Sequence, residues 1–98
     1  MVFSYTVDGE NPWAAYPGAS GSVVELVGSF TDCQSGGSTI ALGIDHGVLS
    51  IHHFHATNLT DTDEEVQVAV SGATVTITTA TNDDDGTWHA ICQRRGYG

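Results

Sequence analysis

The side chains best suited to chemistry in this 98-residue chain are histidines in one short segment, His52-His53-Phe54-His55. If the segment is a strand, alternation places His53 and His55 on one face with Ile51 and sends His52 to the opposite face. Two imidazoles spaced in this way can share a transition metal such as zinc, iron, copper or nickel. The same pair at a contact between subunits would instead make assembly sensitive to pH, because histidine titrates near neutrality. His53 and His55 are therefore a candidate metal site or subunit seam.

Carboxylates cluster in two loops, which are candidate sites for a hard cation such as calcium. Asp61, Asp63 and Glu65 have the alternating spacing of a calcium-binding loop. An EF-hand is excluded, because Val66 stands where that loop needs glycine and Gly72 where it needs the closing glutamate. The second loop is a run of carboxylates without a distal ligand of its own: Asp83, Asp84 and Asp85. Each of the two loops is predicted either to bind cations weakly or to be a solvated acidic turn.

Other spacings typical of catalytic or cofactor sites are missing from the sequence. It contains no nucleophile elbow, phosphate-binding loop, dinucleotide fingerprint or zinc-finger spacing. Cys92 alternates onto the face of Trp88, which predicts core packing, and His89 points to the other face. Cys33 and Cys92 lie far apart and permit either a disulfide or two free thiols. We therefore expect a protein that is not an enzyme and that needs no cofactor beyond a candidate calcium or transition-metal ion.

The charge balance is strongly acidic and argues against several classes of partner. Twelve Asp and Glu face two Arg and no Lys, which gives a formal net charge of −10. Phosphate contacts need Lys and Arg, so neither nucleic acid nor an anionic membrane is an expected partner. The excess of carboxylates is typical of a salt-adapted surface, of a cation-binding surface, or of a face that meets a basic partner. The sequence leaves these three interpretations open.

The elements that must position these residues are strands, because period-two alternation recurs along the chain. The pattern is clearest in residues 73–80, where Val75 and Ile77 face one side and threonines face the other. No segment has a convincing helical periodicity. The predicted strands are 2–7, 22–30, 39–44, 48–56, 65–70, 73–80 and 87–93.

We predict one all-β domain over residues 1–98, folded as a small β-sandwich or β-barrel of about seven antiparallel strands. The tight turn Asp45-His46-Gly47 is predicted to join 39–44 and 48–56 as a hairpin. The predicted organisation is a first strand with an extended arm (1–21), a β core (22–93) and a tail (94–98).

The predicted arm is rich in aromatic residues and carries both prolines of the chain. A loop of this length is unusual in a small domain and is often functional. Trp13 and Tyr16, together with Phe3 of the first strand, are candidate contacts to a neighbouring subunit. The alternative is that the arm folds back and caps the home core.

Taken together, these features resemble small structural proteins of tailed viruses, in particular capsid decoration or cement proteins. The resemblance rests on the arm from Trp13 to Tyr16, a β domain rich in Thr, Val and Gly, and the closing runs 71–77 and 85–88. The pair His53 and His55 is also similar to the ion-binding strands of trimeric phage spike tips. The resemblance implies a homo-oligomer, by preference a trimer, that is seated on a larger protein lattice.

A protein of this kind is expected to be made in the host cytoplasm and to reside in the virion. Two alternatives stay open. The first is a soluble module that binds carbohydrate or cations, using Trp13, Trp88 and the acidic loops. The second is a component of a phage tail or fibre. An assembly protein should associate with itself without ligand, whereas a binding module should be stabilised by its ligand.

Overall fold

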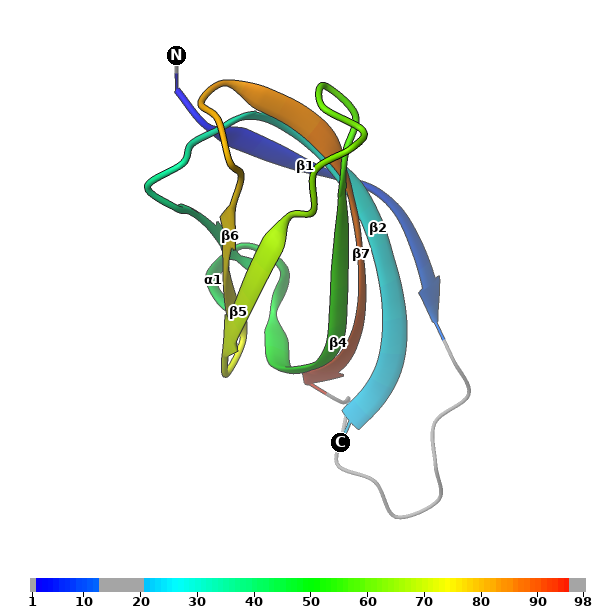
Figure 1. Ribbon diagram of the computed structural model, residues 1–98. Helices are drawn as coiled ribbons and strands as arrows, with labels where there is room; N and C mark the ends of the chain where they lie inside the picture. Colours follow the sequence, from blue (N-terminus) through cyan, green and yellow to red (C-terminus); the bar gives the residue numbers. More distant parts are fainter. Residues whose placement is uncertain (1, 13–20, 96–98) are drawn as a thin grey trace.

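The computed structural model describes residues 2–12 and 21–95 as two packed antiparallel sheets (Figure 1). The larger sheet has the strand order β1-β2-β7-β4, and the smaller sheet has the order β3-β6-β5. The predicted all-β sandwich is confirmed, and the sheets do not close into a barrel. The elements in this part of the chain are β1 (Ser4–Pro12), β2 (Gly21–Cys33), β3 (Ser38–Ala41), α1 (Leu42–His46), β4 (Val48–Asn58), β5 (Gln67–Ser71), β6 (Thr74–Thr78) and β7 (Asp84–Arg95).

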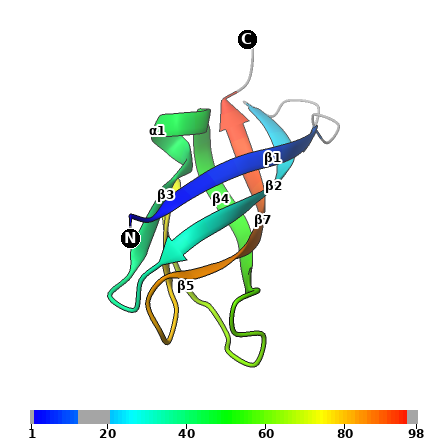
Figure 2. The same cartoon turned by 90° about the horizontal axis from the view of Figure 1, so that it is seen from above.

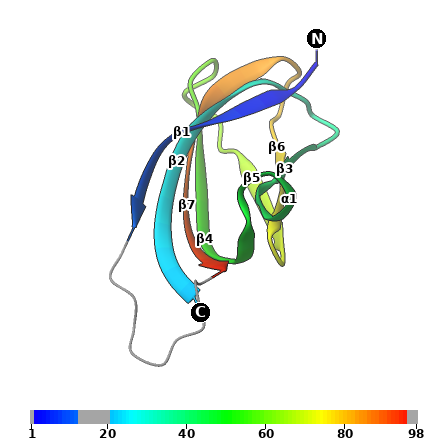
Figure 3. The same ribbon diagram turned by 180° about the vertical axis from the view of Figure 1, so that it is seen from behind.

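Strand β7 runs through the middle of the larger sheet and pairs with β2 on one side and β4 on the other. Its inward side chains include Trp88 and Cys92, which are buried as the alternation predicted. The Trp88 ring stacks on Phe54 of β4, with centroids 5.6 Å apart and an interplanar angle of 11°. Val75 and Ile77 of the smaller sheet are fully buried and complete the core between the layers, which are seen from behind in Figure 3.

The segment after β3 differs from the predicted strand 39–44, because the chain turns into the short helix α1 at Leu42. Leu42 is fully buried, and the Gly43 amide donates to the Ala73 carbonyl at 3.0 Å. The helix ends at Gly47, whose φ of 69° is the left-handed conformation common after helices. The predicted tight turn Asp45-His46-Gly47 is therefore the end of a helix.

The predicted hairpin between 39–44 and 48–56 is therefore wrong. β3 pairs with β6 in the smaller sheet, whereas β4 pairs with β7 in the larger one. The helix α1 carries the chain from one layer to the other, as the view from above shows (Figure 2). Close spacing of two strands in sequence predicted a hairpin, but the strands pair with distant partners.

Strand β4 contains a bulge at His52 that changes which residues face the core. Ile51 is paired with Cys92, and the next pair is His53 with Ile91, so His52 is an extra residue on this strand. Ile51 packs against the core instead of sharing a face with His53, and His52 is exposed. The predicted alternation failed at this point because a bulge inserts one residue without a local sequence signal.

Gly28 of β2 lies where a side chain would collide with its neighbours. A β-carbon there would lie 2.6 Å from two ring carbons of Trp88 and would also meet the carbonyl oxygen of Thr6. We expect Gly28→Ala to lower the free energy of unfolding by about 1–3 kcal/mol, the usual cost of overpacking a core. Urea unfolding followed by circular dichroism measures this change.

Gly36 provides the control, since a β-carbon there would meet nothing within 4 Å. Gly36→Ala should change the free energy of unfolding by less than about 0.5 kcal/mol. Equal unfolding midpoints for the two variants would contradict the close approach of β1, β2 and Trp88.

Candidate functional site

The two acidic loops predicted from the sequence meet at one end of the sandwich, the upper end in Figure 1. One loop follows β4 and the other precedes β7. Asp61, Glu64 and Asp84 each place one carboxylate oxygen within 4.8 Å of the other two. Each loop thus supplies the distal carboxylate that the other lacks in the sequence. We call these three residues the acidic cluster.

Asn58, the last residue of β4, connects the two loops from inside the protein. Its side chain is 1% exposed. Its Oδ1 accepts hydrogen bonds from the amides of Thr60 at 3.0 Å and Asp61 at 2.9 Å, which sets the turn of the first loop. Its Nδ2 donates to Oδ2 of Asp84 at 2.9 Å. One buried amide therefore fixes the carboxylate of Asp84 relative to the loop that carries Asp61.

Asp84 is the buried member of the acidic cluster and is 2% exposed. The Thr81 hydroxyl lies 2.9 and 3.1 Å from the two oxygens of Asp84 and 3.1 Å from Oδ2 of Asp61. A hydroxyl has one proton, so three carboxylate oxygens compete for a single donor. Oε2 of Glu64 is buried and has no hydrogen-bond partner among the described residues. The cluster is rich in acceptors and short of donors.

The other acidic residues singled out from the sequence lie outside this cluster. Asp63 and Glu65 are exposed. The carboxylate of Asp83 accepts a hydrogen bond from Gln34 at 3.0 Å, and that of Asp85 accepts one from the Asp32 amide at 3.0 Å. Glu64 was missed because alternating spacing along a loop does not predict which side chains converge.

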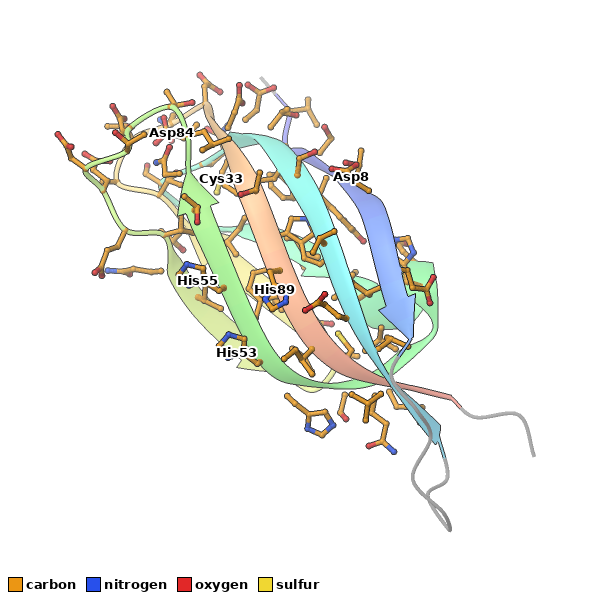
Figure 4. The ribbon with its side chains drawn as sticks, turned by 90° about the vertical axis from the view of Figure 1, so that its right-hand side faces the viewer. Asp8, Cys33, His53, His55, Asp84 and His89 are labelled. Carbon is orange, nitrogen blue, oxygen red and sulfur yellow. The ribbon has the colours of Figure 1, made fainter. Side chains whose placement is uncertain are left out.

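Three histidines occupy the outer face of the larger sheet (Figure 4). His53 and His55 point outward from β4 and are exposed. His89 of β7 stands directly opposite His55 in the strand register, and its ring centroid lies 6.1 Å from that of His53. Nε2 of His89 lies 2.7 Å from Oε2 of Glu25 on β2. The sequence predicted that His89 points outward, but only strand pairing brings it to the other two.

A shallow hollow of about 370 Å³ adjoins two of these histidines on the same face. His55 and His89 lie on its wall, together with Asp8 of β1. Thr57 and Thr87 also line it. A ligand bound at the histidines would therefore have open, partly polar space beside it.

The candidate assembly contacts of the N-terminal region are only partly covered by the structure. Phe3 is half-buried, and its ring lies 6.5 Å from that of Phe30 and 6.3 Å from that of Tyr5. Phe3 therefore packs on the home core with part of its surface. Trp13 and Tyr16 lie outside the described residues.

Both cysteines are buried free thiols, so the two alternatives left open by the sequence resolve against a disulfide. Burial raises the pKa of the Cys92 thiol to about 11, and this thiol is therefore protonated at neutral pH. A protonated, buried thiol is a poor nucleophile and a poor metal ligand.

The outer face of the smaller sheet has no charged side chain among its outward positions. Cross-strand rows on this face consist of small neutral residues, such as Thr39 beside Thr76 and Thr76 beside Ala69. The lack of charge on this face contrasts with the formal net charge of −10 of the whole chain. The outward residues are Thr39, Ala41, Gln67, Ala69, Ser71, Thr74, Thr76 and Thr78. We call them the neutral face.

Comparison of the chain with known protein families, with characterised proteins and with solved structures finds no match. In the described part of the chain, no helix has the length and apolar character to cross a membrane.

The buried amide of Asn58 should be needed for the stability of the acidic end. We expect Asn58→Ala to lower the free energy of unfolding by about 1–3 kcal/mol, because it leaves buried polar groups without partners. Thr62→Ala, at an exposed position of the same loop, is the control and should stay within about 0.5 kcal/mol of the parent protein. Urea unfolding of the three proteins makes the comparison. If Asn58→Ala and Thr62→Ala had the same free energy of unfolding, this role for Asn58 would be ruled out.

Proposed function

We propose that this protein is a non-catalytic structural subunit that associates with copies of itself through the neutral face. The observation that carries the proposal is the lack of charge on this face in a strongly acidic chain. Copies that each carry a charge of −10 repel one another, so close approach is least costly where neither surface is charged. Small side chains also allow two sheets to pack face to face at about 10 Å.

The edge of β5 away from β6 supports the same proposal. Within the described residues, β5 forms a ladder with β6 alone. The chain is tied to β4 just before β5, where Glu65 bridges Thr57, and just after it, where the Ile51 amide donates to the Gly72 carbonyl. Between these two points the edge has no ladder partner, and Val70 there is 45% exposed. An edge strand with unpaired backbone groups is a template for pairing with another chain unless charges or proline protect it. Strand β5 contains neither. The neutral face and its open edge are therefore suited to contact between subunits.

The larger assembly in this proposal is a virion, which rests on the resemblance to capsid decoration proteins. Oligomers of the subunit would seat on the capsid lattice, and many weak symmetric contacts would add avidity. Exposed carboxylates such as Asp63 and Glu65 would keep free subunits from clumping. A tail or fibre component is the alternative location for the same kind of subunit.

A charge placed on the neutral face should disrupt self-association. Thr76 lies between Thr39 and Ala69 at the centre of this face, and its side chain is exposed. We expect the parent protein to be oligomeric by light scattering, and Thr76→Glu to be monomeric and folded. Juxtaposed like charges across a symmetric interface cost several kcal/mol. The exposed-loop variant Thr62→Glu has the same added charge and should stay oligomeric. A monomeric parent protein, or an oligomer that survives Thr76→Glu, would refute the proposal.

A second candidate function, a cation-binding module, is favoured by the acidic cluster. Calcium binds six to eight oxygens at about 2.3–2.6 Å, so oxygens on opposite sides of the ion are about 4.6–5.2 Å apart. Three carboxylate oxygens within 4.8 Å of one another fit that spacing. The buried, unpartnered Oε2 of Glu64 would gain a partner from such an ion. The carbohydrate form of this alternative has less support, since Trp88 is 2% exposed and cannot stack on a sugar.

Calcium should stabilise the protein if the acidic cluster binds it. At a concentration of 100 times the Kd, the free energy of unfolding should rise by about 2.7 kcal/mol relative to a sample in EDTA. Glu64→Gln should remove most of this gain, whereas Asp63→Asn, which alters an exposed carboxylate outside the cluster, should retain it. Thermal unfolding with and without CaCl₂ makes the measurement. An equal gain in both variants, or none in the parent protein, would eliminate the site.

A further inference from the structure

We propose that His53, His55 and His89 form a binding site for a transition-metal ion such as Zn²⁺ on the outer face of the larger sheet. The site would lie within one chain and would need no second copy. It is separate from the neutral face, which belongs to the smaller sheet, and its nitrogen ligands differ in kind from the oxygens of the acidic cluster.

The strand register places the three histidines at the corners of a small triangle. His53 and His55 are two positions apart on β4, so their backbones are separated by about 6.6 Å. His89 stands directly opposite His55, where β-carbons of paired strands are about 4.5–5.5 Å apart. The rings of His53 and His89 are also close, with centroids 6.1 Å apart. All three side chains project from the same face, so their rings can converge above the sheet (Figure 4).

Zinc binding requires a modest rotation of exposed rings. Nitrogens bound to one tetrahedral zinc at about 2.0–2.1 Å are about 3.3 Å from each other. Among the described residues, only the acidic cluster already has its ligand atoms within 4.8 Å, so the histidine rings must turn toward one another. His53 and His55 are exposed and can rotate about their side-chain bonds without disturbing the core. The bulge at His52 leaves both rings on the outer face while Ile51 packs inward.

Glu25 is positioned to orient the third histidine. Its carboxylate lies 2.7 Å from Nε2 of His89, and each side chain is about one-third exposed, 29% and 36% respectively. A metal-binding histidine commonly donates its other ring N–H to a carboxylate, which fixes the tautomer and makes the ligand nitrogen more basic. We therefore assign Nδ1 of His89 to the metal and Nε2 to Glu25. Glu25 acts as a positioning residue, and its negative charge also favours a cation nearby.

The donor set selects the class of ion. Imidazole nitrogens suit zinc, copper, nickel and iron, whereas calcium and magnesium prefer oxygen ligands. The buried thiol of Cys92 does not compete, because burial raises its pKa to about 11 and holds it protonated. Three histidine ligands leave one position of a tetrahedral ion for water. The hollow beside His55 and His89 provides space for that water.

Isothermal titration of the metal-free protein with ZnCl₂, in the presence of excess CaCl₂, tests the proposal. The excess calcium competes with zinc for oxygen ligands such as those of the acidic cluster, whereas it does not compete for the histidine nitrogens. We expect one zinc per chain. His53→Gln, His55→Gln and His89→Gln should each weaken binding by at least tenfold, and Glu25→Gln by about 10–100-fold. Unchanged circular dichroism confirms that each variant is folded.

His52→Gln is the matched control, because His52 is exposed and adjacent in sequence but lies at the bulge. This variant should bind zinc as the parent protein does. Absence of zinc binding, or binding unaffected by His89→Gln, would overturn the proposal. A stoichiometry of one zinc per three chains would also overturn it, because it would place His53 and His55 at a symmetric seam between subunits.

Discussion

The double pairing of strand β7 is the constraint on which the rest of the structure depends. Because β2 and β4 both take their register from β7, its alternation decides which side chains face the core and which face outward. Trp88 lies inward and builds the core, while its neighbour His89 lies outward beside the other histidines. A slip of one residue would exchange these two faces, so the core and the histidine arrangement are consequences of the same register.

The inward alternation of β7 begins at Asp84, and this explains why a carboxylate is buried at the end of the sandwich. A buried carboxylate is costly unless it is hydrogen-bonded, and Asn58 and Thr81 supply the donors. The same hydrogen bonds draw the two acidic loops together and bring Asp61 and Glu64 to Asp84. The feature that stabilises this end of the fold is therefore also the one that creates a candidate cation site. The neutral face of the smaller sheet carries no such carboxylates.

Features that depend on alternation along one strand, such as which side chains face the core, could be predicted from the sequence. Features that depend on which strands pair could not. The inward positions of Val75, Ile77 and Trp88 were predicted correctly, since a period of two is visible along each strand. The partner of β3 was not predicted, because the turn before Gly47 read as a hairpin and is the end of a helix. The two carboxylate loops were found from composition, but Glu64 and the role of Asn58 emerge only when both loops are in place. His89 joins His53 and His55 through strand register alone, and Trp13 and Tyr16 lie outside the described residues.

We conclude that the register of β7 keeps the proposed histidine site apart from the acidic cluster. The most direct test of this separation is NMR chemical-shift mapping of backbone amides in one sample, with Zn²⁺ and Ca²⁺ added in turn. Zinc should shift amides around His55 and His89 in the middle of the larger sheet. Calcium should shift amides of residues 58–64 and 81–84, and the two sets should not overlap. Shifts of the same amides by both ions, or of none by either, would contradict the assignment of one site to the outer face of the larger sheet and another to the acidic end of the sandwich.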